Sequence, residues 1–255
     1  MSEATARSHG DVPAPDPRRA IDKAVIAPRP TRRYRAAMFQ TYVLVASVAF
    51  VSLAVLAHTV AYFPLDLTIT KWVQNYHGQW FAQLMYSLSW IGFYPQVAIM
   101  ATTICIALFV TGLRWEAVSS LIAACGVGIG TLVKLVVYRP RPSPDLIRVF
   151  AQLPSSGFPS GHVLEFTAFG GFLTFLTFTL LKPSPLRVVL LVIFCSVIGL
   201  MGLSRIYQGQ HWFSDVMGAY LFGSLWLMLT IRIYRSGKAR FFVTQPVAKG
   251  PVPAQ

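Results

Sequence analysis

Residues 185–206 read PLRVVLLVIFCSVIGLMGLSRI, an almost entirely apolar run with one arginine near each end. A helix that crosses a bilayer needs about 20 consecutive, mostly apolar residues. This run meets that requirement, and similar stretches lie at 38–63, 94–113, 115–137, 162–181 and 213–233. Because six such spans leave little sequence for anything else, we expect an all-α polytopic membrane protein, built as a six-transmembrane-helix bundle.

The composition excludes an ordinary soluble domain, because only 12% of the 255 residues are charged and 55% are hydrophobic. The formal net charge of +13 would favour a nucleic-acid partner for a soluble protein. Basic residues beside spans instead mark the cytoplasmic side and attract anionic head groups. We therefore expect membrane lipids, and no nucleic acid, as partners. The basic residues of the two tails are Arg7, Arg18, Arg19, Lys23, Arg29, Arg32, Arg33, Arg35, Arg232, Arg235, Lys238, Arg240 and Lys249.

This charge distribution predicts that both termini are cytoplasmic. We expect a disordered basic tail over residues 1–36, a six-span domain over 37–236 and a second cytoplasmic tail over 237–255. The first 37 residues contain no apolar core, so we expect no cleavable signal and an uncleaved first span. Segments 64–93 and 138–161 then face outward.

Between the first two spans, Ile69, Trp72, Val73 and Tyr76 recur at helical spacing. This pattern favours an amphipathic helix that lies at the membrane interface. The alternative is a loop whose aromatic residues simply lie in the interfacial belt.

Small residues within the spans have a packing explanation. Gly126 and Gly130 form a G-x-x-x-G pair, which most simply permits close helix packing. Cys105, Cys125 and Cys195 all lie in apolar stretches, where we expect small buried hydrophobic residues rather than a disulfide or a metal site.

Polar residues gather where predicted spans meet the outer surface. Because a bundle brings these ends together, residues that are distant in sequence are expected to share one site. The groups are Lys134 through Arg139-Pro140 to Arg141-Pro142, then Pro159-Ser160-Gly161-His162, and finally Ser204-Arg205 with His211 and Asp215.

The cations and the second group together suit a phosphate. Lys134, Arg141 and Arg205 offer fixed positive charge and many N–H donors. Ser160 and Gly161 begin the fourth span, and a helix amino terminus presents unpaired backbone N–H groups to an anion. The same donors can stabilise the equatorial oxygens of a phosphoryl transition state.

The histidines suit phosphoryl transfer. His211 and Asp215 lie one helical turn apart and share a face, so the carboxylate can accept the proton of one ring nitrogen. The other nitrogen is then free to attack phosphorus. His162, from another span, can protonate the leaving group and later deprotonate the attacking water. Such a site needs no metal and no cofactor.

Each feature also has a plain structural alternative. A single histidine at the end of a span is usually an interfacial hydrogen-bonding residue, arginines there usually snorkel to head groups, and Pro-Ser-Gly is usually a turn and helix cap. The combination favours function, because ionisable residues in membranes are costly and tend to be functional.

Together, the motifs Lys134-x6-Arg141-Pro142, Pro159-Ser160-Gly161-His162 and Ser204-Arg205-x5-His211-x3-Asp215 resemble the three-part signature of the type-2 phosphatidic acid phosphatase (lipid phosphate phosphatase) superfamily. That superfamily also includes vanadium haloperoxidases and glucose-6-phosphatase. The motifs cover residues 134–215, and the six-span layout extends the similarity to most of the chain, which points to the integral membrane branch. A haloperoxidase is disfavoured because those relatives are soluble.

The resemblance implies that His211 is the nucleophile that forms a phosphohistidine, that Asp215 orients it and that His162 is the acid–base residue. It also implies phosphate binding by Lys134, Arg141, Ser160, Gly161 and Arg205. Glu165 follows His162 by one turn and is not part of that signature. A functional Glu165 would tune His162 or contact a substrate head group. The structural alternative is that Glu165 only binds a neighbouring basic or hydroxyl group. Asp145 and Arg148 are further possible head-group contacts, with a solvated loop as the alternative.

We therefore expect a metal-independent hydrolase of a lipid phosphomonoester or pyrophosphate. Undecaprenyl pyrophosphate, phosphatidylglycerophosphate, phosphatidate and diacylglycerol pyrophosphate are all compatible. The compact chain favours a bacterial cytoplasmic (inner) membrane, with the active site on the periplasmic face. One alternative is a lipid-linked phosphotransferase that uses the same histidine with an acceptor other than water. A second is a non-catalytic lipid transporter or scaffold. The sequence leaves the oligomeric state open.

Overall fold

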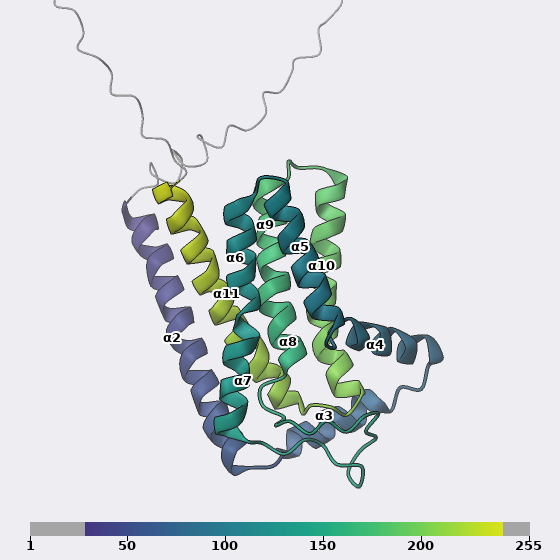
Figure 1. Cartoon of the computed structure of the whole chain (residues 1–255). Helices are drawn as coiled ribbons and strands as arrows, with labels where there is room; N and C mark the ends of the chain where they lie inside the picture. Colours follow the sequence, from purple (N-terminus) through teal and green to yellow (C-terminus); the bar gives the residue numbers. More distant parts are fainter. Residues whose placement is uncertain (1–28, 242–255) are drawn as a thin grey trace, which may run out of the picture. The chain divides into compact units, whose positions relative to one another are not determined.

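The computed structural model describes residues 29–241, and every regular element among them is a helix (Figure 1). The all-α prediction is therefore confirmed. Most of the two predicted tails lies outside the described residues, which exclude 1–28 and 242–255. Where the tails are described they are helical, because the first helix begins at Arg29 and the last ends at Phe241. Ala, Arg and Met are strong helix formers, so the helix of the first span continues toward the amino terminus.

The described chain divides into two units between Leu44 and Val45. The first unit contains the N-terminal part of α2 (Arg29–Thr59), where Tyr34, Met38 and Leu44 are exposed. Exposed apolar side chains on a helix of this length suit contact with lipid tails. The second unit contains the rest of α2 and all other helices.

The remaining helices follow one another with short connections, except for a long loop over residues 138–160. They are α3 (Pro64–Gln74), α4 (Gln79–Ile91), α5 (Gln96–Val110), α6 (Arg114–Ala124), α7 (Gly126–Val137), α8 (Gly161–Glu165), the π-helical stretch η1 (Phe166–Gly170), α9 (Gly171–Leu180), α10 (Pro185–Tyr207) and α11 (Phe213–Phe241).

The described chain has five helical runs that are long and apolar enough to cross a membrane, at Arg33–Thr59, Arg114–Val137, Gly161–Leu180, Pro185–Tyr207 and Phe213–Arg240. The predicted second span corresponds to α5, whose 15 residues are short for a bilayer. Helices α4 and α5 pass the same test only as a pair, which is bent by 61°. The count is therefore five spans, or six if the bent pair crosses as one.

Two of the predicted spans are interrupted. The third breaks at Cys125 between α6 and α7, and the fourth contains η1 between α8 and α9. Single π-helical turns inside α-helices frequently occur at functional sites. In this chain η1 directly follows α8, the short helix that contains His162 and Glu165.

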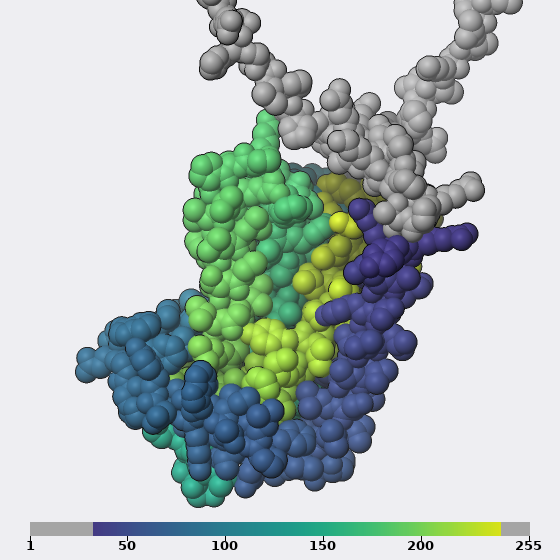
Figure 2. Space-filling view, turned by 180° about the vertical axis from the view of Figure 1, so that it is seen from behind, coloured from purple at the N-terminus to yellow at the C-terminus, as the bar shows by residue number. Residues whose placement is uncertain are grey.

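Within the second unit, the 138–160 loop lies at the same end as α3 and the α10–α11 turn (Figure 1). The α5–α6 and α9–α10 connections lie at the opposite end. Seen from behind, α3 and α4 (blue) lie against the end of α10 (green) (Figure 2). The segments that the sequence places on the outer side therefore share one end of this unit.

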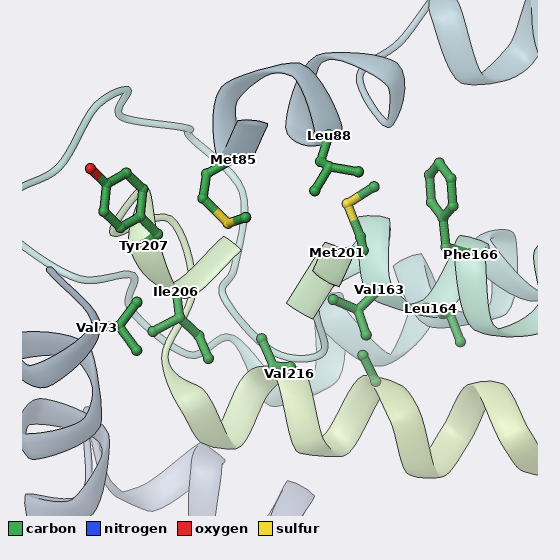
Figure 3. Packing of buried hydrophobic residues seen from close by; sticks show 11 residues of the cluster. Val73, Met85, Leu88, Val163, Leu164, Phe166, Met201, Ile206, Tyr207 and Val216 are labelled. Atoms are coloured by element: carbon green, nitrogen blue, oxygen red, sulfur yellow. The ribbon is translucent and has the colours of Figure 1, made fainter. Parts of the chain in front are cut away.

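A buried hydrophobic cluster joins the helix ends at this position (Figure 3). Met85 and Leu88 of α4 belong to it with Met201 of α10, Val163 of α8 and Val216 of α11. Close-packed side chains transmit the position of one helix to the next. The cluster therefore fixes the ends of α8, α10 and α11, which carry the predicted catalytic residues.

Gly126 and Gly130 permit the close packing that their spacing predicts. A Cβ atom at Gly126 would stand 2.6 Å from Trp226 of α11, and one at Gly130 would stand 2.3 Å from Leu164 of α8. The expectation for the cysteines is only partly right. Cys105 is half-buried, but Cys125 and Cys195 are exposed, because the apolar surface of a membrane helix can face outward as well as inward.

The helix predicted between the first two spans is present as α3. Val73 is buried and Ile69 packs against the hydrophobic cluster, whereas Trp72 is 77% exposed. Tyr76 follows the end of α3. The second helix of this segment, α4, is not expected from that pattern. The position of α3 at a membrane interface stays a prediction.

Candidate active site

The structure brings the three predicted polar groups to one end of the second unit. The N–H of Ser160 donates to the carbonyl oxygen of Asp215 at 3.2 Å, which joins the second group to the third. Arg141 Nη1 lies 3.2 Å from His211 Nε2, which joins the first group to the third. Lys134 Nζ donates at 2.8 Å to the carbonyl oxygen of Ser156, in the loop before α8. The three groups therefore lie together, and their role as one active site stays a prediction.

The turn from α10 to α11 places His211 and Asp215. Gly209 in this turn has φ +64°, and a Cβ atom there would stand 2.1 Å from the carbonyl oxygen of Arg148, so the turn requires glycine. Asp215 lies in the first turn of α11, where its Oδ2 accepts the N–H of Trp212 at 2.9 Å. A carboxylate at this position caps the helix and complements its dipole.

The imidazole of His211 lies between Arg141 and Asp215. Its Nδ1 is 3.6 Å from Oδ2 of Asp215, which is longer than a hydrogen bond but close enough for the carboxylate to stabilise positive charge that develops on the ring. A guanidinium can only donate, so the Nε2 atom beside Arg141 is the unprotonated nitrogen. The neutral ring then carries its proton on Nδ1, on the side of Asp215. This tautomer leaves the lone pair on Nε2.

His211 is 2% exposed, and burial together with the positive charge of nearby Arg141 holds its pKa well below the usual value for histidine. Burial disfavours the charged form of the ring, and adjacent cations act in the same direction. The ring is therefore neutral at physiological pH, and its lone pair is available without prior loss of a proton.

Arg139 is fully buried and forms ion pairs with two carboxylates. Its Nη1 donates to Oδ1 of Asp215 at 2.7 Å, and its Nη2 donates to Oδ2 of Asp66 at 3.0 Å. Ser214 joins the same network, since its Oγ accepts from Arg139 at 2.6 Å and donates to Asp66 at 2.8 Å. Pairing of this kind offsets the cost of burying a charge. The network connects α3 to the start of α11 and holds the carboxylate of Asp215.

Lys134, Arg141 and Arg205 supply the remaining positive charge. Among residues 29–241, none of the three forms an ion pair with a carboxylate. Arg141 Nη1 donates to the carbonyl oxygen of Gln210 at 2.6 Å, and the fully buried Arg205 donates to Oγ of Ser89 and to Oε1 of Gln210. Cations held without counter-charges favour an anionic ligand.

Within the described chain, five of the eight buried side-chain atoms that have no hydrogen-bond partner belong to residues singled out from the sequence. Buried polar atoms are nearly always bonded, so a cluster of exceptions indicates a place where a polar ligand can bind. The five atoms are Ser160 Oγ, His162 Nε2, Glu165 Oε2, Arg205 Nε and His211 Nδ1. A Cβ atom built on Gly161 would meet nothing within 4 Å, so this end of α8 is open to a ligand.

An apolar groove of about 780 Å³ leads to the same end of α8. It runs along α5, α6 and α7, and its lining extends from Phe109 to His162 and Glu165. The ring of His162 packs edge-on against Phe93, with 4.8 Å between the ring centroids. The groove therefore connects an apolar helix surface to the polar site.

The three possible head-group residues lie in different environments. Glu165 is 7% exposed, and no described residue forms a hydrogen bond with its Oε2. The structure therefore gives no support to the alternative that Glu165 binds a neighbouring basic or hydroxyl group. Arg148 is bound to α3 instead of being free for a head group. Its backbone N–H donates to Oε1 of Gln74 at 3.1 Å, and its guanidinium donates to the Gln74 carbonyl oxygen. Asp145 is exposed in the loop.

Among residues 29–241, no three His, Cys, Asp or Glu side chains are grouped as metal ligands. The expectation of a site without metal or cofactor stays a prediction.

The model of the PAP2 superfamily matches residues 113–238, which include every predicted site residue. Through this region the chain belongs to the PAP2 superfamily. The resemblance found in the three motifs is thereby confirmed at the level of the family.

Two solved structures share the fold of this PAP2 protein. A transmembrane PAP2-type phosphatidylglycerolphosphate phosphatase from Bacillus subtilis has a TM-score of 0.66 and 22% identity, over 76% of this chain and 96% of that chain. Aquifex aeolicus LpxE has a TM-score of 0.55 and 18% identity, over 67% of this chain and 96% of that chain. The apolar helices and the shared membrane PAP2 fold make this chain an integral membrane protein.

One curated relative is similar in sequence. Sphingosine-1-phosphate phosphatase 2 from Homo sapiens is 35% identical over 105 residues, which are 40% of this chain. The matched region spans only 26% of the length of that relative.

The motifs of this PAP2 protein locate the site but not the residues that hold it in place. Asp66 lies outside the matched range, and no sequence pattern singles it out. Its only signal is a carboxylate between the first two predicted spans, three residues before Ile69. Arg139 belongs to the first polar group but has no role assigned from the sequence. Segments 64–93 and 138–161 contain two acidic residues, Asp66 and Asp145, so the sequence limits the counter-charge of Arg139 in these segments to one of the two.

Proposed function

We propose that this PAP2 protein is a membrane phosphatase that hydrolyses a lipid phosphomonoester or pyrophosphate through a phosphohistidine. One observation carries the proposal: the neutral His211 lies beside three cations that have no carboxylate partner among the described residues. The apolar groove that ends at His162 supports a lipid substrate. The names of two relatives, a phosphatidylglycerolphosphate phosphatase and a sphingosine-1-phosphate phosphatase, support the same class.

Substrate binding replaces contacts that the cations now make with carbonyl oxygens. Lys134 and Arg141 exchange their carbonyl partners for phosphate oxygens, and the unpartnered Nε of Arg205 points to a further contact. Ser160 Oγ and the N–H of Gly161 add donors at the start of α8. Because Arg141 now contacts Nε2 of His211, its transfer to the phosphate also frees the attacking atom.

In the first chemical step, Nε2 of His211 attacks phosphorus, a P–N bond forms and the P–O bond to the lipid breaks. Asp215, held by Arg139, stabilises the positive charge that develops on the ring. His162, which starts the cycle in its protonated form, donates this proton to the leaving oxygen and becomes neutral. In the second step, water that gives its proton to His162 attacks phosphorus, and the P–N bond breaks. Inorganic phosphate leaves, and His211 returns to its neutral form.

The basic tails support cytoplasmic termini, and hence a site on the periplasmic face of a bacterial inner membrane. The groove along α5, α6 and α7 supports lateral entry of the lipid from the bilayer.

Phosphate release from a panel of lipids tests the proposal. Purified wild-type, His211→Ala and His77→Ala proteins are assayed with chelator on undecaprenyl pyrophosphate, phosphatidylglycerophosphate, phosphatidate and diacylglycerol pyrophosphate. His77 is exposed and outside the site, so its variant is the matched control. We expect release by wild type and His77→Ala but not by His211→Ala. The ranking of the four lipids then identifies the substrate.

Two other outcomes would redirect the assignment. Release that requires an added sugar or lipid acceptor would favour the phosphotransferase. No release from any lipid by folded protein, with or without an acceptor, would favour a non-catalytic transporter or scaffold.

A further inference from the structure

Glu165 lies one helical turn after His162, where α8 passes into η1. It is 7% exposed, and its Oε2 atom has no hydrogen-bond partner within the described chain. The proposed reaction gives this carboxyl group no role. An unpaired acidic group in a membrane helix is costly and is a marker of function.

The surroundings of Glu165 offer little that could bind it. On one side it lines the groove, together with small apolar residues of α5 and α6 such as Ala101 and Ala117. On the other side it borders a cavity of about 80 Å³, lined by residues such as Phe166 and Ile104. The partner that the carboxyl group accepts from must therefore be able to enter the groove.

The spacing from His162 limits where that partner can lie on a lipid. Residues three apart on a helix have Cβ atoms about 5–6 Å from each other. His162 is the residue proposed to protonate the ester oxygen of the lipid. A donor that reaches Glu165 while His162 contacts that oxygen lies about two to three bonds from the ester.

We propose that Glu165 determines specificity by accepting a hydrogen bond from a hydroxyl or ammonium group that the lipid carries close to its phosphate ester. This inference rests on the proposed phosphatase function. Long-chain amino-alcohol phosphates and monoacylglycerol phosphates carry such a donor. Diacylglycerol phosphates and polyprenyl phosphates carry none. A carboxyl group accepts from either donor, and an ionised one binds ammonium more strongly.

Three single-chain substrates of similar length test the inference. Hexadecyl phosphate has no donor, 1-palmitoylglycerol 3-phosphate has a hydroxyl, and sphinganine 1-phosphate has a hydroxyl and an ammonium. They are compared in wild type, Glu165→Leu and Glu165→Gln. The matched control is Glu116→Gln, because Glu116 is also buried but is bound by Tyr234 and Lys238 outside the groove.

We expect Glu165→Leu to lower kcat/KM for both donor-bearing lipids about tenfold or more relative to hexadecyl phosphate. Glu165→Gln keeps an accepting oxygen, so it should retain more of the preference for the hydroxyl than of the preference for the ammonium. Glu116→Gln should leave all ratios unchanged. Ratios between substrates measured on one preparation are independent of the fraction of folded enzyme.

If phosphate is released but Glu165→Leu does not change the ratios of kcat/KM between the three lipids, the inference is overturned. The phosphatase function is then still supported. Absence of release from all three lipids would instead count against the phosphatase function. In that case the role of Glu165 is tested by the increase in melting temperature that sphinganine and hexadecanol each cause in wild type and in Glu165→Leu. Stronger stabilisation by sphinganine that disappears in Glu165→Leu would support the inference, and equal stabilisation in both proteins would overturn it.

Discussion

The two carboxylate oxygens of Asp215 bind different neighbours, and this explains the long distance between Asp215 and the ring of His211. One oxygen pairs with Arg139 and the other accepts the N–H of Trp212, so the histidine ring stands 3.6 Å away. Contacts of catalytic groups are often long without substrate and tighten when it binds. We infer that phosphate binding, which draws Arg141 away from the ring, lets His211 close on Asp215.

Replacing Asp66 by asparagine removes one of the two carboxylates that pair with the buried Arg139. Breaking a buried ion pair typically costs about 3–5 kcal/mol, so we expect a clearly lower melting temperature. Because Asp66 reaches the site only through Arg139 and Ser214, kcat should fall while KM changes little. Thermal unfolding and steady-state kinetics measure both effects. The exposed Asp145→Asn is the control, and an Asp66→Asn variant with unchanged kcat would show that the network does not position Asp215.

The lowered pKa of His211 predicts an unusual pH dependence. A histidine with the ordinary pKa of about 6.5 would lose about nine-tenths of its neutral form when the pH falls to about 5.5. We expect no such loss in the rate of phosphoenzyme formation, measured by rapid quench, because His211 stays neutral. A tenfold decrease centred near pH 6.5 that follows the nucleophile would contradict this prediction.

The same shift acts on stability with a definite sign. The unfolded chain takes up a proton at His211 near pH 6.5, whereas the folded chain does not. The free energy of unfolding should therefore decrease as the pH falls through that value. His211→Gln should weaken this decrease, which thermal unfolding across the pH range can detect.

The individual residues differ in whether their role can be predicted from the sequence. His162, His211 and Asp215 are recognisable because each lies in a short motif, and the residues of a motif are close together in the sequence. Asp66 is not, because its partner Arg139 lies far along the sequence and only the folded chain brings them together. The unpartnered environment of Glu165 likewise depends on what α5 and α6 present to it.

The spans follow the apolar stretches of the sequence, but the interruptions of the helices cannot be predicted from them. The break at Cys125 and the π-helical η1 occur without proline, because packing between helices decides where a span bends. Thr167 in η1 donates to the carbonyl oxygen of Val163 at 2.6 Å, a contact that disturbs regular helix geometry. The span predicted at 94–113 is present as the short α5, and it forms a pair bent by 61° with α4, a helix that the sequence does not predict.

The turn between α10 and α11 provides a test at the level of elements. Gly209→Ala would impose about 1–2 kcal/mol of backbone strain and a contact with the Arg148 carbonyl oxygen. We expect lower stability and a large loss of kcat, because this turn places His211. Gly199→Ala in α10 is the control, since a Cβ atom there meets nothing within 4 Å. Equal activity of the two variants would show that the turn does not set the position of His211.

At the scale of the whole molecule, the fold class and the family follow from the sequence, while the number of spans does not. The apolar stretches and motifs suffice for an all-α membrane PAP2 protein, as the matched family model and shared fold confirm. Length and composition alone leave five or six crossings, because the crossing of α4 and α5 depends on how the bend meets the bilayer.

Reporter fusions test the predicted orientation. A reporter that is active only in the periplasm should be inactive when fused after Gln255 and active when inserted after Asp145 in the exposed loop. The basic tails provide the physical reason, because positive charge beside spans is retained in the cytoplasm. The opposite pattern of activities would place the site on the cytoplasmic face.

The most direct test of the central claim is to map the covalent intermediate. Wild-type, His211→Ala and His77→Ala proteins are mixed with a lipid phosphate that wild type hydrolyses, quenched at alkaline pH and analysed by peptide mass spectrometry. We predict a phosphoryl group on His211 in wild type and His77→Ala, and none in His211→Ala. Phosphate on a different residue, or undiminished hydrolysis by His211→Ala, would contradict the account.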